Sequence, residues 1–139
     1  MAGEIVVGYD GTQCADAALG VAIDLARDLG TKLVLTFAYD PPRIGGEVRD
    51  LDEALEHRGE EVMAAASAKA KEAGVETETV IHKEKASVAL ASLAQERKAR
   101  FIVLGGYGER PATGAILGST PHKLLHISET PVIVVPVHE

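Results

Sequence analysis

The chain has 139 residues, of which 46% are hydrophobic, so it is long enough for one folded core and short for two. Its formal net charge is -7, from 21 acidic and 14 basic residues. Nucleic-acid backbones and anionic membranes are therefore not expected as partners, because both require clustered Lys and Arg. We expect a single domain over residues 1–139.

The start of the chain predicts its compartment. It carries no charged-then-apolar leader and no long apolar span, and the one cysteine, Cys14, cannot form an internal disulfide. We therefore expect a cytoplasmic protein. Aromatic residues are scarce, so the core should consist of Val, Ile, Leu and Ala, which is typical of strands covered on both faces by helices.

The first third of the chain predicts a strand, a helix and a second strand. An apolar run over 5–7 closes at the turn-forming residues 8–12, which indicates a buried parallel strand. Apolar residues then recur at helical spacing from Ala15 to Leu29, and Gly30 lies where a glycine commonly ends a helix. The second strand is predicted from Lys32 to Tyr39.

The remaining elements continue this alternation. Residues 41–50 are rich in turn formers and predict an irregular connection. We then expect a helix over 51–73 that ends at Gly74, a strand over 75–81, a helix over 86–94, a strand over 101–104, a helix that starts near Thr120 with Pro121 in its first position, and a strand over 132–135.

Alternating strands and helices predict an α/β fold, doubly wound, with a parallel sheet and right-handed crossovers. In such folds the ligand lies outside the carboxyl ends of the strands, where the winding reverses direction. Two turn-rich segments follow predicted strands, at residues 8–12 and 105–108. They are the candidate ligand loops.

The second loop has the character of a phosphate site. The apolar run 101–104 enters Gly105-Gly106-Tyr107-Gly108, and Gly118, Ser119 and Thr120 precede the last helix. Bare backbone N–H groups and a helix N-terminus both favour an anion. A P-loop is excluded because Gly3 and Gly8 are followed by Tyr9 and Asp10, with no lysine. The dinucleotide fingerprint is excluded because Pro111 stands where its third glycine is needed.

The spacing Gly105-x-x-Gly108, nine residues, then Gly118-Ser119 resembles the motif of the universal stress protein family, whose ATP-binding members carry it after their fourth strand. Residues 6–12 resemble the family's opening strand and turn, and residues 131–136 its last strand. The resemblance covers nearly the whole chain. It implies five parallel strands in the order 3-2-1-4-5, with helices on both faces.

The resemblance also implies the ligand and its contacts. The expected ligand is ATP or another adenine nucleotide, with Mg²⁺. Asp10 would contact the adenine or ribose, Ala38 would offer backbone groups to the adenine, and Leu104 an apolar contact. The predicted binding residues are Asp10, Gly11, Thr12, Ala38, Leu104, Gly105, Gly108, Arg110, Gly118, Ser119 and Thr120. The family often has a second Ser where this chain has Pro121.

Several of these residues also have a purely structural interpretation. The glycines could only permit turns, and Asp10 could close a turn with Gly11. Ser119 or Thr120 could cap the last helix, and we expect Ser119 on the phosphate with Thr120 as the cap. An exposed loop arginine such as Arg110 is more often only solvated.

The remaining reactive side chains do not form a second site. His122 and His126 are four residues apart, but no third metal ligand is evident, so a metal site is not expected. Cys14 is expected to pack in the core.

Three functions remain open at this point. The first is a nucleotide-dependent stress sensor or regulator, for which the resemblance implies a homodimer through the edge strand Val132 to Val135. The second is an ATPase or nucleotidyl-transfer enzyme, although no catalytic base or activated nucleophile is evident beside the loop, so slow ATP hydrolysis is the most that we expect. The third is a dimerisation module that binds no nucleotide, which the intact glycine spacing disfavours.

Overall fold

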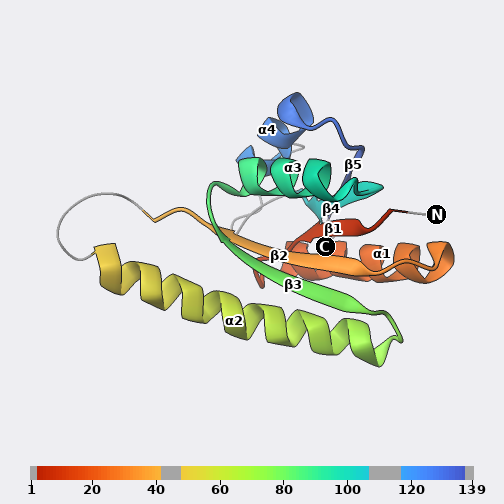
Figure 1. Cartoon of the computed structure of the whole chain (residues 1–139), viewed down its shortest axis with the longest axis horizontal. Coiled ribbons are helices and arrows are strands. Elements are labelled where there is room, and N and C mark those ends of the chain that lie inside the picture. Colours follow the sequence, from red (N-terminus) through yellow and green to blue (C-terminus); the bar gives the residue numbers. More distant parts are fainter. Residues whose placement is uncertain (1–2, 42–47, 107–116, 137–139) are drawn as a thin grey trace.

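The computed structural model describes residues 3–41, 48–106 and 117–136, and strands and helices alternate through them (Figure 1). The elements are β1 (Ile5–Gly8), α1 (Gln13–Leu29), β2 (Leu33–Tyr39), α2 (Val48–Glu72), β3 (Thr77–Lys83), α3 (Ala86–Arg97), β4 (Phe101–Gly105), α4 (Ser119–Ile127) and β5 (Val132–Val135). None of these helices combines the length and apolar character that crossing a membrane requires.

The five strands form one parallel sheet in the order β3-β2-β1-β4-β5, which confirms the predicted fold and strand order. The central strand β1 pairs with β2 on one side, where Gly8 lies opposite Thr36, and with β4 on the other. The chain winds outward from β1 to β3 and then returns to β4. The direction of winding therefore reverses between β1 and β4, where a ligand is expected in this class of fold.

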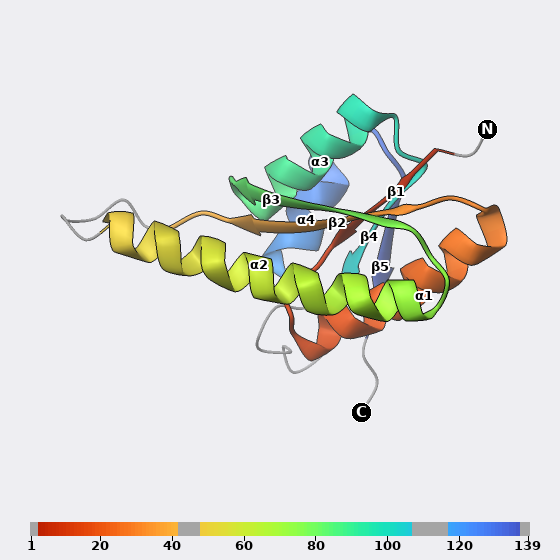
Figure 2. The same cartoon turned by 60° about the horizontal axis from the view of Figure 1, so that its bottom comes forward.

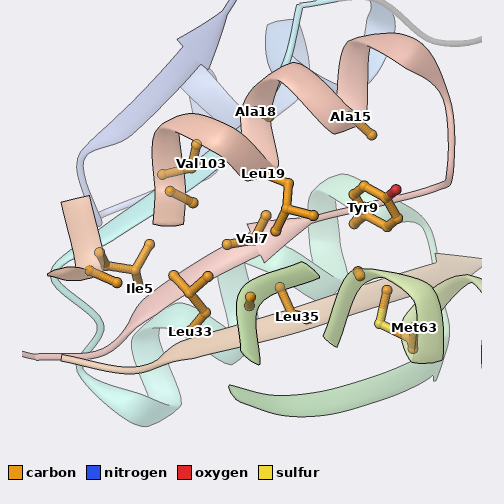
Figure 3. Close-up of a cluster of buried hydrophobic side chains, with 14 of the residues drawn as sticks. Ile5, Val7, Tyr9, Ala15, Ala18, Leu19, Leu33, Leu35, Met63 and Val103 are labelled. Carbon is orange, nitrogen blue, oxygen red and sulfur yellow. The ribbon is translucent and has the colours of Figure 1, made fainter. Parts of the chain in front are cut away.

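Helices cover both faces of the sheet, with α3 and α4 on one face and α1 and α2 on the other (Figures 1 and 2). Side chains alternate along β1, so Ile5 and Val7 pack beneath α1 while Val6 packs beneath α3 and α4. Figure 3 shows the first of these cores, in which Leu19 of α1 meets Val7 and Leu33. The three inner strands β1, β2 and β4 are buried on both faces, as their continuous apolar runs predicted, whereas the edge strand β3 is partly exposed.

The ends of α2 differ from the sequence prediction. Val48 begins the helix three residues before the predicted start, and Leu51, where the helix was expected to begin, is exposed. At the other end, Gly74 has a φ of 81° and the Val75 N–H donates to the Ala70 carbonyl. This helix-ending motif places the Val75 side chain in the core, so β3 begins at Thr77 and not at the predicted Val75.

An ion-pair network joins the amino ends of three strands to α3. Lys32 lies 3.1 Å from Glu4 and 3.2 Å from Glu78, and Arg97 binds both carboxylates. Hydrogen bonds from Arg97 and Lys32 lower the pKa of Glu78 below its usual value. The network lies at the edge of the sheet opposite to the candidate ligand loops, so its role is structural.

Two glycines inside helices have opposite surroundings. A Cβ atom on Gly59 of α2 would lie 2.7 Å from the ring of Phe37, which projects from β2. A Cβ atom on Gly20 of α1 would meet nothing within 4 Å. Gly59 therefore permits α2 to approach the sheet closely, whereas Gly20 only adds backbone freedom to the unfolded chain.

We therefore predict opposite effects for the same substitution. Gly20→Ala should raise the free energy of unfolding by about 0.5–1 kcal/mol, because alanine favours the helix. Gly59→Ala should lower it by about 1–3 kcal/mol, because the methyl group displaces the Phe37 ring. Urea unfolding of both variants and the wild type measures the two changes. Stabilisation by Gly59→Ala would contradict the packing described here.

Candidate functional site

A pocket with a volume of about 180 Å³ opens at the carboxyl edge of the sheet, between the ends of β1, β2 and β4 and the first turns of α3 and α4. It contains most of the predicted binding residues, although they come from opposite halves of the chain. Those that line it are Asp10, Thr12, Ala38, Leu104, Gly105, Gly118, Ser119 and Thr120. Gly11 is not among the lining residues, and Gly108 and Arg110 lie outside the described residues.

At one side of the pocket, Asp10 and Thr12 form a tight turn that begins α1. The Asp10 Oδ1 atom accepts hydrogen bonds from the Thr12 N–H, at 3.0 Å, and from the Thr12 hydroxyl, at 2.6 Å. Thr12 Oγ1 in turn accepts from the Ala15 N–H, as an N-cap residue does. Asp10 thus has the turn-forming role, and it is also exposed at the pocket.

Gly11 serves the backbone of this turn. Its φ of 85° lies in the left-handed region, which a residue with a Cβ atom adopts only at a cost. A Cβ atom there would also lie 3.3 Å from Val62 of α2. Both observations explain why residue 11 is a glycine without invoking a ligand.

At the other side of the pocket, α4 begins without a side-chain cap. Gly118 is the N-cap residue, and no side chain caps the helix. The prediction that Thr120 caps α4 is therefore wrong, because Thr120 is the second residue of the helix. The prediction that Pro121 takes the first position is also wrong. Proline is accepted at the third position because the first turn has no intrahelical acceptor for its missing N–H.

This helix start has the properties of an anion site. The N–H groups of Ser119 and Thr120 lie in the first turn, where helix geometry provides no carbonyl acceptor. The helix dipole adds positive potential at the same point. Gly118 has φ -64° and ψ 166°, a conformation open to any residue, so its backbone shape does not explain the glycine. A bare N-cap does leave these donors accessible to a ligand.

Close packing against Cys14 explains why residue 105 is a glycine. A Cβ atom on Gly105 would lie 2.6 Å from the Cys14 Sγ atom and 2.8 Å from the Cys14 carbonyl oxygen. The glycine therefore permits the first turn of α1 to pack against the end of β4. Cys14 is buried there, as predicted, with its thiol 3.8 Å from the Val135 carbonyl oxygen.

A polar chain links the wall of the pocket to α2. The Tyr9 hydroxyl donates to Asp16, which also binds Lys69 of α2 at 2.8 Å. Burial, followed by the neighbouring Asp16 carboxylate, raises the pKa of Tyr9 well above its usual value. Although partial burial opposes it, hydrogen bonding to Lys69 and Tyr9 lowers the pKa of Asp16. Tyr9 is therefore a neutral donor that ties the end of β1 to α1, and the Asp16–Lys69 ion pair joins α1 to α2.

The inner part of the pocket is mostly apolar. Residues that the sequence analysis did not select complete it, namely Gly8, Tyr9, Ala15, Thr36, Ala86, Leu90 and Pro121. The sequence did contain a signal for Thr36, because Thr36 is the one hydroxyl residue within the apolar run 33–38. The residues of α3 carried no such signal, because their approach to β1 depends on the packing of the whole sheet.

The candidate metal residues do not form a cluster. The rings of His122 and His126 contact each other edge to face, with centroids 5.0 Å apart, and both residues are exposed. In the part of the chain that the structure describes, no three His, Cys, Asp or Glu side chains are grouped as metal ligands. Asp10 is the one charged side chain among the described residues that line the pocket.

Comparison with known proteins identifies the fold and the family. The family model described as the universal stress protein family matches residues 1–136. The chain belongs to the universal stress protein family. It is 27% identical to the universal stress protein YxiE of Bacillus subtilis, over 97% of this chain and 99% of that protein. It is 30% identical to a universal stress protein of Mycobacterium tuberculosis, over 94% of each.

Solved universal stress proteins have the same architecture. A universal stress protein in complex with cAMP is 29% identical and has a TM-score of 0.76, over 98% of this chain and 97% of that one. A universal stress protein of Archaeoglobus fulgidus in complex with dAMP has a TM-score of 0.71 over 97% of this chain and 98% of that one. At 19% identity, the second comparison supports the fold alone.

The Thr12 cap yields a prediction about this universal stress protein's stability. Thr12→Ala should lower the free energy of unfolding by about 1 kcal/mol, because the Ala15 N–H loses its acceptor. Thr12→Ser keeps the hydroxyl and should lose much less. Urea unfolding of both variants tests the cap. An equal loss in the two variants would mean that the methyl group, and not the hydroxyl, stabilises the turn.

Proposed function

We propose that this universal stress protein binds an adenine nucleotide, with ATP as the leading ligand, and acts as a nucleotide-dependent regulator of a stress response. The observation that carries the proposal is the uncapped start of α4 beside the turn that follows β1. In this proposal the phosphates lie on the N–H groups of Ser119 and Thr120, next to the bare backbone of Gly118. Gly108 and Arg110 remain predicted contacts on the same loop.

The rest of the pocket suits the nucleoside. Ala38, Leu90 and Leu104 supply apolar contacts for a flat base. In the described strand pairs, β1 ends at Gly8 opposite Thr36, while β2 continues to Tyr39. The N–H and carbonyl groups of Ala38 that point toward β1 thus lie beyond the last β1–β2 pair, Gly8 with Thr36. This position supports the predicted contact with the adenine. Asp10 at the rim would bind the ribose or the base.

A relative supports adenine nucleotides as the ligand class. The universal stress protein that was solved with cAMP aligns with nearly the whole of this chain at 29% identity. The linear phosphate chain of ATP would reach more of the N–H groups at the start of α4 than the cyclic phosphate of cAMP would. Mg²⁺ would accompany ATP and offset its charge, since the chain is itself acidic.

The pocket favours a regulator over a dedicated enzyme. Among its described lining residues there is no histidine, lysine or cysteine, and one Asp10 oxygen already accepts two hydrogen bonds from Thr12. Pro121 lacks the N–H and the hydroxyl that serine often provides at this position in the family. We therefore propose binding with at most slow ATP hydrolysis, and a turnover assay measures that rate.

We also propose that the protein is cytoplasmic and that it forms a homodimer through β5. In the described sheet β5 pairs with β4 on one side, and its residues Val132, Ile133 and Val134 are half-buried. The exposed apolar residues Leu125 and Ile127 lie on α4, the helix that leads to this strand. An apolar edge strand is a surface that a second copy can cover by strand pairing.

The test uses a variant that caps α4 with its own side chain. Gly118→Asp should keep or raise the thermal stability, because aspartate is a favourable N-cap. It should weaken ATP binding by at least about tenfold, since the carboxylate occupies the phosphate donors and repels the ligand. Calorimetric titration of ATP with Mg²⁺ measures the affinity, and a thermal melt measures the stability.

Gly20→Asp is the matched control, because it makes the same change of charge at an exposed position on α1. It should bind ATP as the wild type does. Unchanged binding by a folded Gly118→Asp variant would exclude the α4 start as the phosphate site. No binding by a folded, ligand-free wild type would reject the nucleotide proposal and favour the dimerisation module.

A further inference from the structure

We propose that Thr36 selects the base of the nucleotide, by accepting a hydrogen bond from an exocyclic amino group such as that of adenine. This inference rests on the proposed function, because it assumes that a nucleotide occupies the pocket. It assigns a distinct role to a side chain inside β2, far in sequence from the glycine motif.

The sheet places Thr36 at the inner end of the pocket. Thr36 lies on the same face of β2 as Val34 and Ala38, and Gly8 of β1 is its neighbour across the strand pair. A Cβ atom on Gly8 would lie 2.9 Å from the Leu90 side chain and 3.5 Å from Leu104. The bare Gly8 therefore permits Leu90 of α3 to pack closely against β1, and Gly8, Thr36 and Leu90 all line the pocket.

Thr36 is a polar group in an apolar setting. It is 1% exposed, and its neighbours in the pocket include Leu90, Leu104 and Ala86. The other polar side chain in the described lining that is more than nine-tenths buried is Tyr9. The Tyr9 hydroxyl donates to Asp16, and its ring belongs to the core under α1 and α2. Thr36 is thus the buried hydroxyl available at this end.

The hydrogen bond of Thr36 determines what it can offer. Its hydroxyl donates to the Val34 carbonyl of its own strand, at 3.3 Å. The proton is thereby engaged, and the oxygen keeps its lone pairs as acceptors. A donor on the ligand, such as the 6-amino group of a purine, complements this arrangement, whereas a 6-oxo group would place two acceptors together. The site should therefore prefer adenine to bases that carry a carbonyl there.

The alternative is that Thr36 is only a strand residue. Valine has the same shape and suits a β-strand in an apolar core, where a hydroxyl costs free energy unless it is hydrogen-bonded. A purely structural Thr36 would therefore make Thr36→Val neutral for binding. The proposal instead expects Thr36→Val to keep or raise the thermal stability while weakening ATP binding.

The experiment removes the same hydrogen bond from each side. Wild type, Thr36→Val and the matched control Thr36→Ser are titrated with ATP and with purine riboside 5′-triphosphate, which lacks only the 6-amino group. Wild type and Thr36→Ser should bind ATP about 3- to 10-fold more tightly than the analogue. Thr36→Val should bind the two ligands with nearly equal affinity, so that the two deletions are not additive.

The outcomes separate this inference from the function on which it rests. If wild type binds ATP and the analogue equally well, the role proposed for Thr36 is wrong, but the proposed nucleotide site is unaffected. This comparison requires no variant. The same conclusion follows if Thr36→Val retains the full preference for ATP. If Thr36→Val does not fold, Thr36→Ala makes the same deletion. No ATP binding by folded wild type would overturn both proposals.

Discussion

The pairing of β1 with β2 on one side and β4 on the other is the constraint on which the site depends. Because β1 is central, the chain must wind outward to β3 and then return across the sheet to β4. The turn after β1 and the loop after β4 are therefore 93 residues apart in sequence, from Thr12 to Gly105, yet both lie at one edge of the sheet. The uncapped start of α4 and Asp10 then line the same pocket. The apolar pairs that align these strands, such as Val7 with Val103, thus position the polar groups of the site.

Close backbone contacts maintain this arrangement, and several glycines serve them. Gly105 permits α1 to contact the end of β4, Gly59 permits α2 to lie on Phe37, and Gly11 forms the turn between β1 and α1. Gly118 differs, because its φ of -64° is open to any residue and its position is one where a capping side chain would stabilise the helix. The absence of a side-chain cap there costs stability that a bound anion would restore, and this contrast supports the proposal that Gly118 leaves the helix start free for a ligand.

Much of this fold could be predicted from sequence because short apolar runs and helical spacing are local signals. The helix from Gln13 to Leu29, ended by Gly30, is an example. The strand order and the ligand class came from the resemblance to the universal stress protein family. The sequence did not reveal that the N-cap position of α4 is Gly118, because Ser119 and Thr120 are better capping residues on local grounds. Nor could it reveal that Gly105 packs against Cys14 or that Thr36 pairs with Gly8, since the partners lie far apart in the chain.

The central claim is that an anionic ligand binds the first turn of α4 while its base lies against β2. The most direct test is an NMR titration of the ¹⁵N-labelled chain with ATP and Mg²⁺. The amide resonances of Ser119 and Thr120 should shift together with that of Ala38, at one saturation midpoint, while the amide resonances of Glu78 and Arg97 should not shift. Shifts confined to other surfaces, or none at millimolar ATP, would contradict it.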